Sequence, residues 1–134
     1  MKTAAEMVDV IRKEYRNALR IWKEASEAGA GAYADAKLNE IHTIQHLAEE
    51  MGVSLELQSF YFTFGSDEQY PYGRGDYVIV KAYDIRDAAK AYQRIYPNRD
   101  GSECLNCADY YSAKDWESIY KKYYNGVAPK EVIY

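Results

Sequence analysis

Two pairs of residues in the sequence have the spacing of metal ligands. They are His42 with His46, one helical turn apart, and Cys104 with Cys107, separated by two residues. Side chains at i and i+4 share a helix face, and zinc favours a tetrahedral shell such as two cysteines and two histidines. The order is the reverse of a zinc finger, however, and nothing else in the sequence brings the pairs together. We therefore expect no metal, with zinc at these four residues as the minor alternative.

Catalytic motifs give no stronger signal. No serine lies in a nucleophile elbow, and the glycine pairs at 29/31 and 73/75 lack the strand-to-helix context and the Lys-Ser/Thr of a phosphate loop. Glycines in such surroundings are typical of turns. The sequence therefore predicts a protein that is not an enzyme and needs no cofactor, and a zinc-dependent or otherwise unrecognised enzyme stays open as an alternative.

Acidic residues and tyrosines gather in two segments that are typical of a protein-binding surface. Tyrosine gives a large contact area at a small entropic cost, and carboxylates spaced along a surface can imitate the phosphates of a nucleic acid. In the first segment, 66–77, the expected partner-binding residues are Asp67, Glu68, Tyr70, Tyr72 and Asp76. In the second, 100–117, they are Asp100, Glu103, Asp109, Tyr110 and Tyr111. The simpler alternative is that the tyrosines replace phenylalanine in a small core and the acids serve as caps and turns.

The composition limits the kind of partner. The chain has 134 residues, enough for one domain or a compact domain with a helical appendage, and it carries 17 basic and 21 acidic residues for a formal net charge of -4. This balance speaks against a protein whose affinity comes from neutralising phosphates. Direct nucleic-acid binding is therefore not expected, and a protein with a basic surface is the expected partner.

The sequence also predicts a cytoplasmic location. No apolar run approaches the roughly 20 residues of a membrane helix, so no membrane contact is expected. The first residues are charged and helical in pattern rather than those of a signal peptide. Two cysteines are also too few for a secreted disulfide scaffold.

Residues 1–54 are predicted to form a helical hairpin, with one long bent helix as the alternative. Thr3 and Glu6 make a capping-box pattern, a glycine-rich stretch at 29–31 interrupts the helical period, and Gly52 is placed to end the second helix. The apolar residues expected to face inward are Val8, Ile11, Tyr15, Ala18, Trp22 and Ala25, then Leu38, Ile41, Ile44, Leu47, Ala48 and Met51.

Residues 55–134 are predicted to form a small α+β domain, which makes the fold class α+β: a helical hairpin followed by a small antiparallel sheet with two helices. Phe60, Phe62 and Phe64 alternate with other residues, so they should share one sheet face and meet a later helix. A second strand is expected at 77–83, a short one within 105–111 and an edge strand at 132–134.

Asp84 and Ser112 are the expected N-caps of the two later helices. The side chains expected to face inward are Ile85, Ala88, Ala89, Tyr92 and Ile95 in the first of these helices, and Trp116, Ile119, Tyr120 and Tyr123 in the second.

Three segments carry a resemblance: FYFTFGSDEQYPY at 60–72, LNCADYYSAKDWE at 105–117 and GVAPKEVIY at 126–134. With them, residues 58–134 resemble small proteins encoded by phages and prophages of gut Firmicutes. The resemblance implies a mobile-element context, in which small acidic proteins often disable host defence, and anti-CRISPR proteins are the best-described class of that kind.

Together with the acidic, tyrosine-rich segments, this resemblance leads us to expect a stoichiometric inhibitor in the host cytoplasm. The expected partner is an RNA-guided nuclease of the Cas9 type with its guide RNA, whose basic nucleic-acid-binding surface the protein would occupy. The alternative is a phage regulator associated with single-stranded nucleic acid. In that case Tyr61, Tyr70, Tyr72, Tyr110 and Tyr111 would stack on bases.

Overall fold

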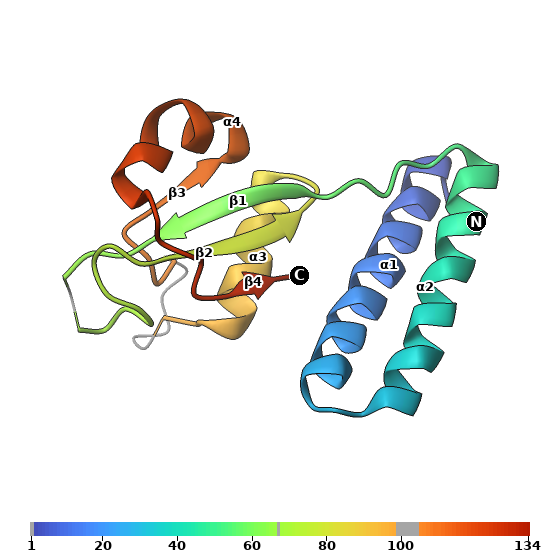
Figure 1. The fold of residues 1–134 in the computed structure, drawn as a ribbon. Coiled ribbons are helices and arrows are strands. Elements are labelled where there is room, and N and C mark those ends of the chain that lie inside the picture. The colour runs from blue at the N-terminus through green and yellow to red at the C-terminus, as the bar shows by residue number, and fades with distance from the viewer. Residues whose placement is uncertain (1, 67, 99–104) are drawn as a thin grey trace. The chain divides into compact units, whose positions relative to one another are not determined.

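The computed structural model describes residues 2–66, 68–98 and 105–134 (Figure 1). The chain divides into two compact units, Met1–Glu56 with Tyr134, and Leu57–Ile133. The first unit is helical, and the second combines a four-stranded sheet with helices. This content confirms the predicted α+β class. Among the described residues, no helix combines the length and the apolar character that crossing a bilayer requires.

The first unit is a hairpin of α1, Ala4–Glu27, and α2, Gly31–Met51. The predicted cap of α1 is confirmed, because the Thr3 hydroxyl accepts a hydrogen bond from the Glu6 backbone N–H. Gly52 ends α2 in the left-handed conformation with φ 70°, which glycine adopts without strain. The hairpin, rather than one bent helix, is therefore the structure of this region.

Small residues form the contact between α1 and α2. The fully buried side chains are Ala18 and Ala25 on α1 and Ala34, Ile41 and Ala48 on α2. Each set repeats every seven residues, as along the seam of a coiled coil.

The placement of Leu47 and Met51 in the hairpin core was wrong, because both side chains are exposed. They lie off the alanine seam that α1 and α2 bury between them.

The sheet of the second unit has the strand order β3-β1-β2-β4. Its strands are β1, Gln58–Thr63, β2, Tyr77–Ala82, β3, Asp109–Ser112, and β4, Val132–Ile133. β1 pairs antiparallel with both β2 and β3, whereas β4 pairs parallel with β2. The sheet is therefore mixed and not purely antiparallel as expected. Strand β4 reaches the β2 edge after a long connection that includes a helical segment, which is what a parallel pair requires.

One face of the sheet holds the main core. Phe60 and Phe62 lie opposite Val80 and Val78 in the β1–β2 register, and all four are buried. Helix α3, Ile85–Ile95, covers this face, and the Tyr92 ring stacks on Phe62 at 4.5 Å between centroids. The predicted contact of the phenylalanine face with a later helix is thus confirmed.

Two of the predicted inward residues of α3 are misplaced. Ile85 and Ile95 are exposed, while Ala88, Ala91 and Tyr92 are buried. The predicted N-cap is confirmed, since the Asp84 carboxylate accepts a hydrogen bond from the Asp87 backbone N–H at 2.8 Å. Ile85 and Ile95 are the first and last residues of the helix.

A helical segment covers the other face of the sheet (Figure 1). It runs through α4, Ala113–Asp115, the π turn η1, Trp116–Tyr120, and the 3₁₀ turn η2, Lys121–Tyr124. The Asp115 backbone N–H donates to the Ser112 hydroxyl, which confirms the expected cap.

Two of the four predicted inward residues of this segment are confirmed, since Trp116 and Tyr120 pack against rings of the sheet. The other two, Ile119 and Tyr123, are exposed, and Tyr124 packs against Trp116 instead. A π turn closes i to i+5 hydrogen bonds and holds more residues than an α-helical turn, so every later side chain is shifted in phase.

Replacing Phe62 by Ala is expected to lower the free energy of unfolding of the second unit by about 3 to 5 kcal/mol, because its side chain is 0% exposed and packs between β2 and α3. Chemical denaturation measures the change. Tyr123→Ala, at an exposed ring, is the control and should shift stability by no more than about 0.5 kcal/mol. A loss below about 1 kcal/mol for Phe62→Ala would count against this core.

Candidate functional site

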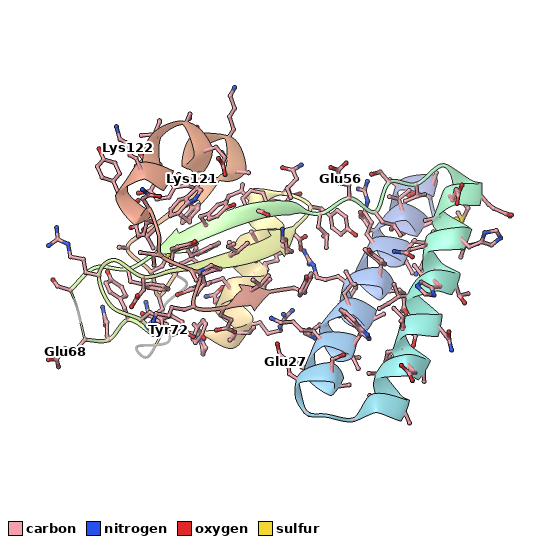
Figure 2. The ribbon with its side chains drawn as sticks, viewed as in Figure 1. Glu27, Glu56, Glu68, Tyr72, Lys121 and Lys122 are labelled. Atoms are coloured by element: carbon pink, nitrogen blue, oxygen red, sulfur yellow. The ribbon has the colours of Figure 1, made fainter. Side chains whose placement is uncertain are left out.

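The tyrosines of the first predicted segment belong to the protein's own packing. Tyr70 and Tyr72 are partly buried against the main core, with their rings 6.4 and 5.6 Å from Phe64. The Tyr72 hydroxyl (Figure 2) donates to Glu131 Oε2 at 3.0 Å and lies 3.2 Å from the Tyr96 hydroxyl, which also donates to Glu131. These two hydroxyls tie the segment before β4 to the rest of the unit. The rings are therefore not free to cover a partner.

The acids of that segment divide into two kinds. Asp76 accepts a hydrogen bond from the Gly73 backbone N–H at 3.1 Å and lies 3.8 Å from Lys130 Nζ. It therefore stabilises its own loop. The Glu68 side chain is exposed (Figure 2). Asp67 lies outside the described residues, so the structure places one exposed acid of this segment.

In the second segment, the alternation of β3 separates two tyrosines. Tyr111 points to the face covered by the helical segment and stacks on Tyr120 at 3.8 Å between centroids. Tyr110 points to the opposite face and is 45% exposed, and Asp109 is exposed beside it. Asp100 and Glu103 lie outside the described residues.

The two segments meet beside β1. The Asn106 side chain donates to the Gln69 carbonyl at 3.4 Å, and the Ala108 backbone N–H donates to the Thr63 carbonyl at 2.9 Å. Among the members of the predicted partner-binding set that the structure describes, Glu68, Asp109 and Tyr110 are exposed. The described part of this surface therefore offers the carboxylates of Glu68 and Asp109 and the ring of Tyr110.

The candidate metal ligands show no coordinated arrangement within the described residues. His42 and His46 are exposed on α2, and His46 Nε2 lies 3.2 Å from Glu50. Cys107 packs against the main core, where burial raises the pKa of its thiol to about 12. Cys104 lies outside the described part of the chain. Within that part, no three His, Cys, Asp or Glu side chains come together as a metal site.

The feature that the sequence reasoning missed is an apolar patch on the helical hairpin. We call it the hairpin patch, and it consists of the exposed side chains Met7, Val10, Leu47 and Met51. Because the helices are antiparallel, the start of α1 lies level with the end of α2 (Figure 1). On each helix the two patch residues are three or four positions apart and so share a face.

The helical period places charged residues of both helices on the face of the patch. Glu14 of α1 lies one turn from Val10, and Lys37 and Glu40 lie on the same face of α2. The Lys37 ammonium bonds Glu40 at 2.9 Å and lies 5.9 Å from the Tyr33 ring centroid. The bond to Glu40, with a smaller contribution from the charge of Glu14, raises the pKa of Lys37.

The opposite face of the hairpin has its own contact, a hydrogen bond from Gln45 to the Tyr15 hydroxyl at 3.4 Å. The helical period thus assigns Glu14 and Glu40 to the face of the hairpin patch, and Tyr15 and Gln45 to the opposite face.

The patch left a weak signal in the sequence. Apolar residues of both helices occupy a stripe wider than the seam that alanines can fill, since Met7 and Val10 flank the expected inward position Val8. A stripe that wide indicates either a third helix or a partner. Only the alanine seam, seen in three dimensions, shows which residues are left over.

Raising the pH above about 9 is expected to destabilise the second unit. Burial raises the pKa of the Cys107 thiol from 9.0 to about 12 and that of the Tyr111 hydroxyl from 10.0 to about 12. The unfolded chain releases these protons first, so the stability present below about pH 9 is lost as the pH rises towards about 12. Chemical denaturation at a series of pH values measures this loss, which should begin at a higher pH in Cys107→Ala. A stability that stays constant up to about pH 11 would contradict it.

Protein purified without added zinc is expected to contain far less than one equivalent of zinc. Zinc binds the thiolate, and burial raises the pKa of the Cys107 thiol, which makes the thiolate harder to form. Mass spectrometry of the metal content tests this, and a chelator should leave Tm unchanged. One equivalent of zinc that is lost in the double variant Cys107→Ser with His46→Ala would overturn the prediction.

No protein-family model, no curated protein and no solved structure matches this chain. The resemblance of residues 58–134 to phage and prophage proteins, and the function that it implies, therefore stay predictions.

Proposed function

We propose that this protein acts by binding another protein stoichiometrically, with the hairpin patch as the centre of the contact. The observation that carries the proposal is the gathering of four large apolar side chains, each exposed, at one end of one face of the hairpin. Contiguous exposed apolar surface marks interaction sites, whereas scattered apolar residues do not.

The chemistry of the patch suits a protein surface. Two of its four residues, Met7 and Met51, are methionines, whose flexible thioethers fit irregular apolar grooves. Leu47 is 49% exposed, so its burial would remove substantial apolar area from water at about 25 cal/mol per Å². An amphipathic helical face that docks in an apolar groove is a recurring mode of recognition.

The charged residues on the same face as the patch favour a partner of opposite charge. The helical period puts Glu14 and Glu40 on the same face of the hairpin as the patch, and Lys37 is held by Glu40. The first 57 residues carry 10 acidic and 7 basic residues, so this unit is acidic as a whole. Opposite charge steers association and disfavours wrong partners, so a basic protein is the complementary partner.

The specific partner that we propose is an RNA-guided nuclease of the Cas9 type, which the protein inhibits in the host cell. Such nucleases hold nucleic acid in a positively charged channel, and the phage-like C-terminal sequence supports a role against host defence. Of the described acids in the predicted partner-binding set, Asp76 stabilises its own loop, whereas Glu68 and Asp109 are exposed and stay candidates for phosphate mimicry. We place the main contact on the hairpin, where the exposed apolar side chains gather.

A cleavage titration with several purified Cas9 orthologues, with and without guide RNA, tests the proposal. Inhibition is expected at near-stoichiometric ratios, and Leu47→Asp should weaken it at least about tenfold, as the loss of a central contact does. Ile119→Asp is the matched control, since Ile119 is 47% exposed on a helical segment of the other unit, and it should inhibit like the original chain.

The remaining outcomes separate the proposals. If Glu68→Lys with Asp109→Lys weakens inhibition and Leu47→Asp does not, phosphate mimicry is right and the hairpin contact is wrong. If no orthologue is inhibited, this partner is wrong. Light scattering of the free protein tests the remaining occupant of the patch: a dimer that Leu47→Asp dissociates would show that a second copy covers it.

A further inference from the structure

The second face of the sheet carries a cavity that the proposed function does not use. Its volume is about 260 Å³, and it is lined by residues of β1, β2, η1, η2 and the loop that follows η2. Four aromatic rings contribute to its walls, those of Tyr61, Tyr77, Trp116 and Tyr124. Of these rings, Tyr61 and Tyr124 are partly exposed, whereas Tyr77 and Trp116 are buried.

The rings hold one another in place. Trp116 is 3% exposed and stacks on Tyr61, with centroids 4.5 Å apart and planes 5° from parallel. Tyr124 and Tyr77 lie 4.8 and 4.9 Å from Trp116, and they meet each other edge to face at 5.5 Å. The Tyr77 hydroxyl donates to the Val127 carbonyl at 2.8 Å and so fixes the loop. A ligand would meet a preformed wall, which lowers the entropic cost of binding.

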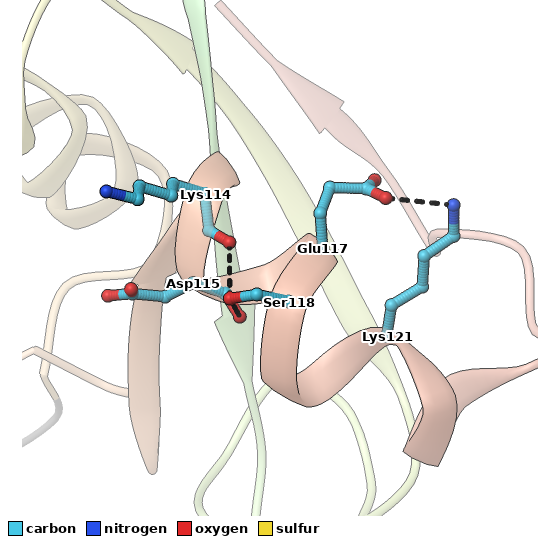
Figure 3. A network of polar contacts seen from close by, with 5 residues as sticks. All are labelled: Lys114, Asp115, Glu117, Ser118 and Lys121. Atoms are coloured by element: carbon cyan, nitrogen blue, oxygen red, sulfur yellow. Dashed lines mark hydrogen bonds and ion pairs between the residues drawn. The ribbon is translucent and has the colours of Figure 1, made fainter.

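The rim carries one acid and one base. Glu117 and Lys121 both line the cavity and form an ion pair at 3.1 Å (Figure 3), with more than half of each side chain exposed. An exposed pair of this kind is weak, because water and salt screen it. The Glu117 carboxylate can therefore exchange Lys121 for the cation of a ligand.

The wall that carries this pair is an unusual piece of backbone. Trp116 and Glu117 lie in the π turn, and the Lys121 backbone N–H closes it on the Trp116 carbonyl. The Ser118 hydroxyl donates to the Lys114 carbonyl at 2.8 Å beside this turn (Figure 3). Isolated π turns are rare and occur frequently at functional sites. Here the turn supplies the Trp116 ring and the Glu117 carboxylate of one cavity wall, and Lys121 directly follows it.

We propose that this cavity binds an organic cation, namely the guanidinium group of an arginine side chain on a protein ligand. Aromatic faces attract cations, and a planar guanidinium can stack on a ring while it bonds a carboxylate with two parallel N–H groups. Glu117 is the counter-ion, and the ligand displaces Lys121 from it. This site is separate from the hairpin patch, so a negative result at one site does not contradict the proposal for the other.

Titration of the full-length protein with N-acetyl-arginine amide, followed by NMR, tests the site. The indole N–H signal of Trp116 is expected to shift and saturate, while that of Trp22, in the other unit, stays unchanged. The uncharged analogue N-acetyl-citrulline amide should produce a much smaller shift. An equal shift with both probes, or no saturable shift of Trp116, would overturn the proposal.

Three variants test the exchange at the rim. Glu117→Gln should lower the affinity for the arginine probe at least about threefold. Lys121→Met should raise this affinity about two- to fivefold, because the variant lacks the competing cation. Lys122→Met is the matched control. Lys122 is the neighbour of Lys121 (Figure 2), its ammonium lies 5.2 Å from the Tyr123 ring centroid, and its variant should bind like the original chain.

The same variants also distinguish an anion site. If inorganic phosphate shifts Trp116 and Lys121→Met abolishes that shift, the cavity recognises anions through Lys121 and the proposal is wrong. Unchanged signals outside the cavity show in each case that the variant is folded.

Discussion

The second unit depends on the burial of β1 on both of its faces. This strand lies between β2 and β3, and its successive side chains point to opposite sides of the sheet. Phe60 and Phe62 therefore enter the core under α3, while Tyr61 stacks on Trp116 under the helical segment. A shift of one residue in register would exchange these sets and bring hydroxyls into the main core, so the register is strongly specified.

The same constraint explains the excess of tyrosine over phenylalanine. Each face of the sheet is covered by one thin helical layer, so many rings have one apolar side and one end near water or a carbonyl. Tyrosine suits such positions because its ring packs and its hydroxyl still finds a partner. The buried Tyr92 donates to the Asn106 carbonyl at 2.6 Å, and Tyr72 and Tyr96 both bond Glu131. Much of the tyrosine content is thus core chemistry rather than a binding surface.

The two helices of the hairpin pack through smaller side chains than the sheet does. Its seam is made mainly of alanines, which let the helices approach but bury little apolar area. The larger side chains are left outside, and that is why the candidate contact surface lies there. Of the described acids singled out for their charge, Asp76 stabilises its own loop, whereas Glu68 and Asp109 are exposed. The surfaces with the clearest binding chemistry are therefore apolar and aromatic, with carboxylates at their rims.

The sequence by itself determined what depends on neighbours along the chain. The caps at Thr3, Asp84 and Ser112 and the alternation of the phenylalanines were predictable, because each involves residues within about one turn or two strand positions. Tertiary structure decided the rest. The parallel pairing of β4, the phase shift of the π turn and the exposure of Leu47 depend on contacts between distant segments. Sequence periodicity measures how wide an apolar stripe is, but only packing decides which of its residues are covered.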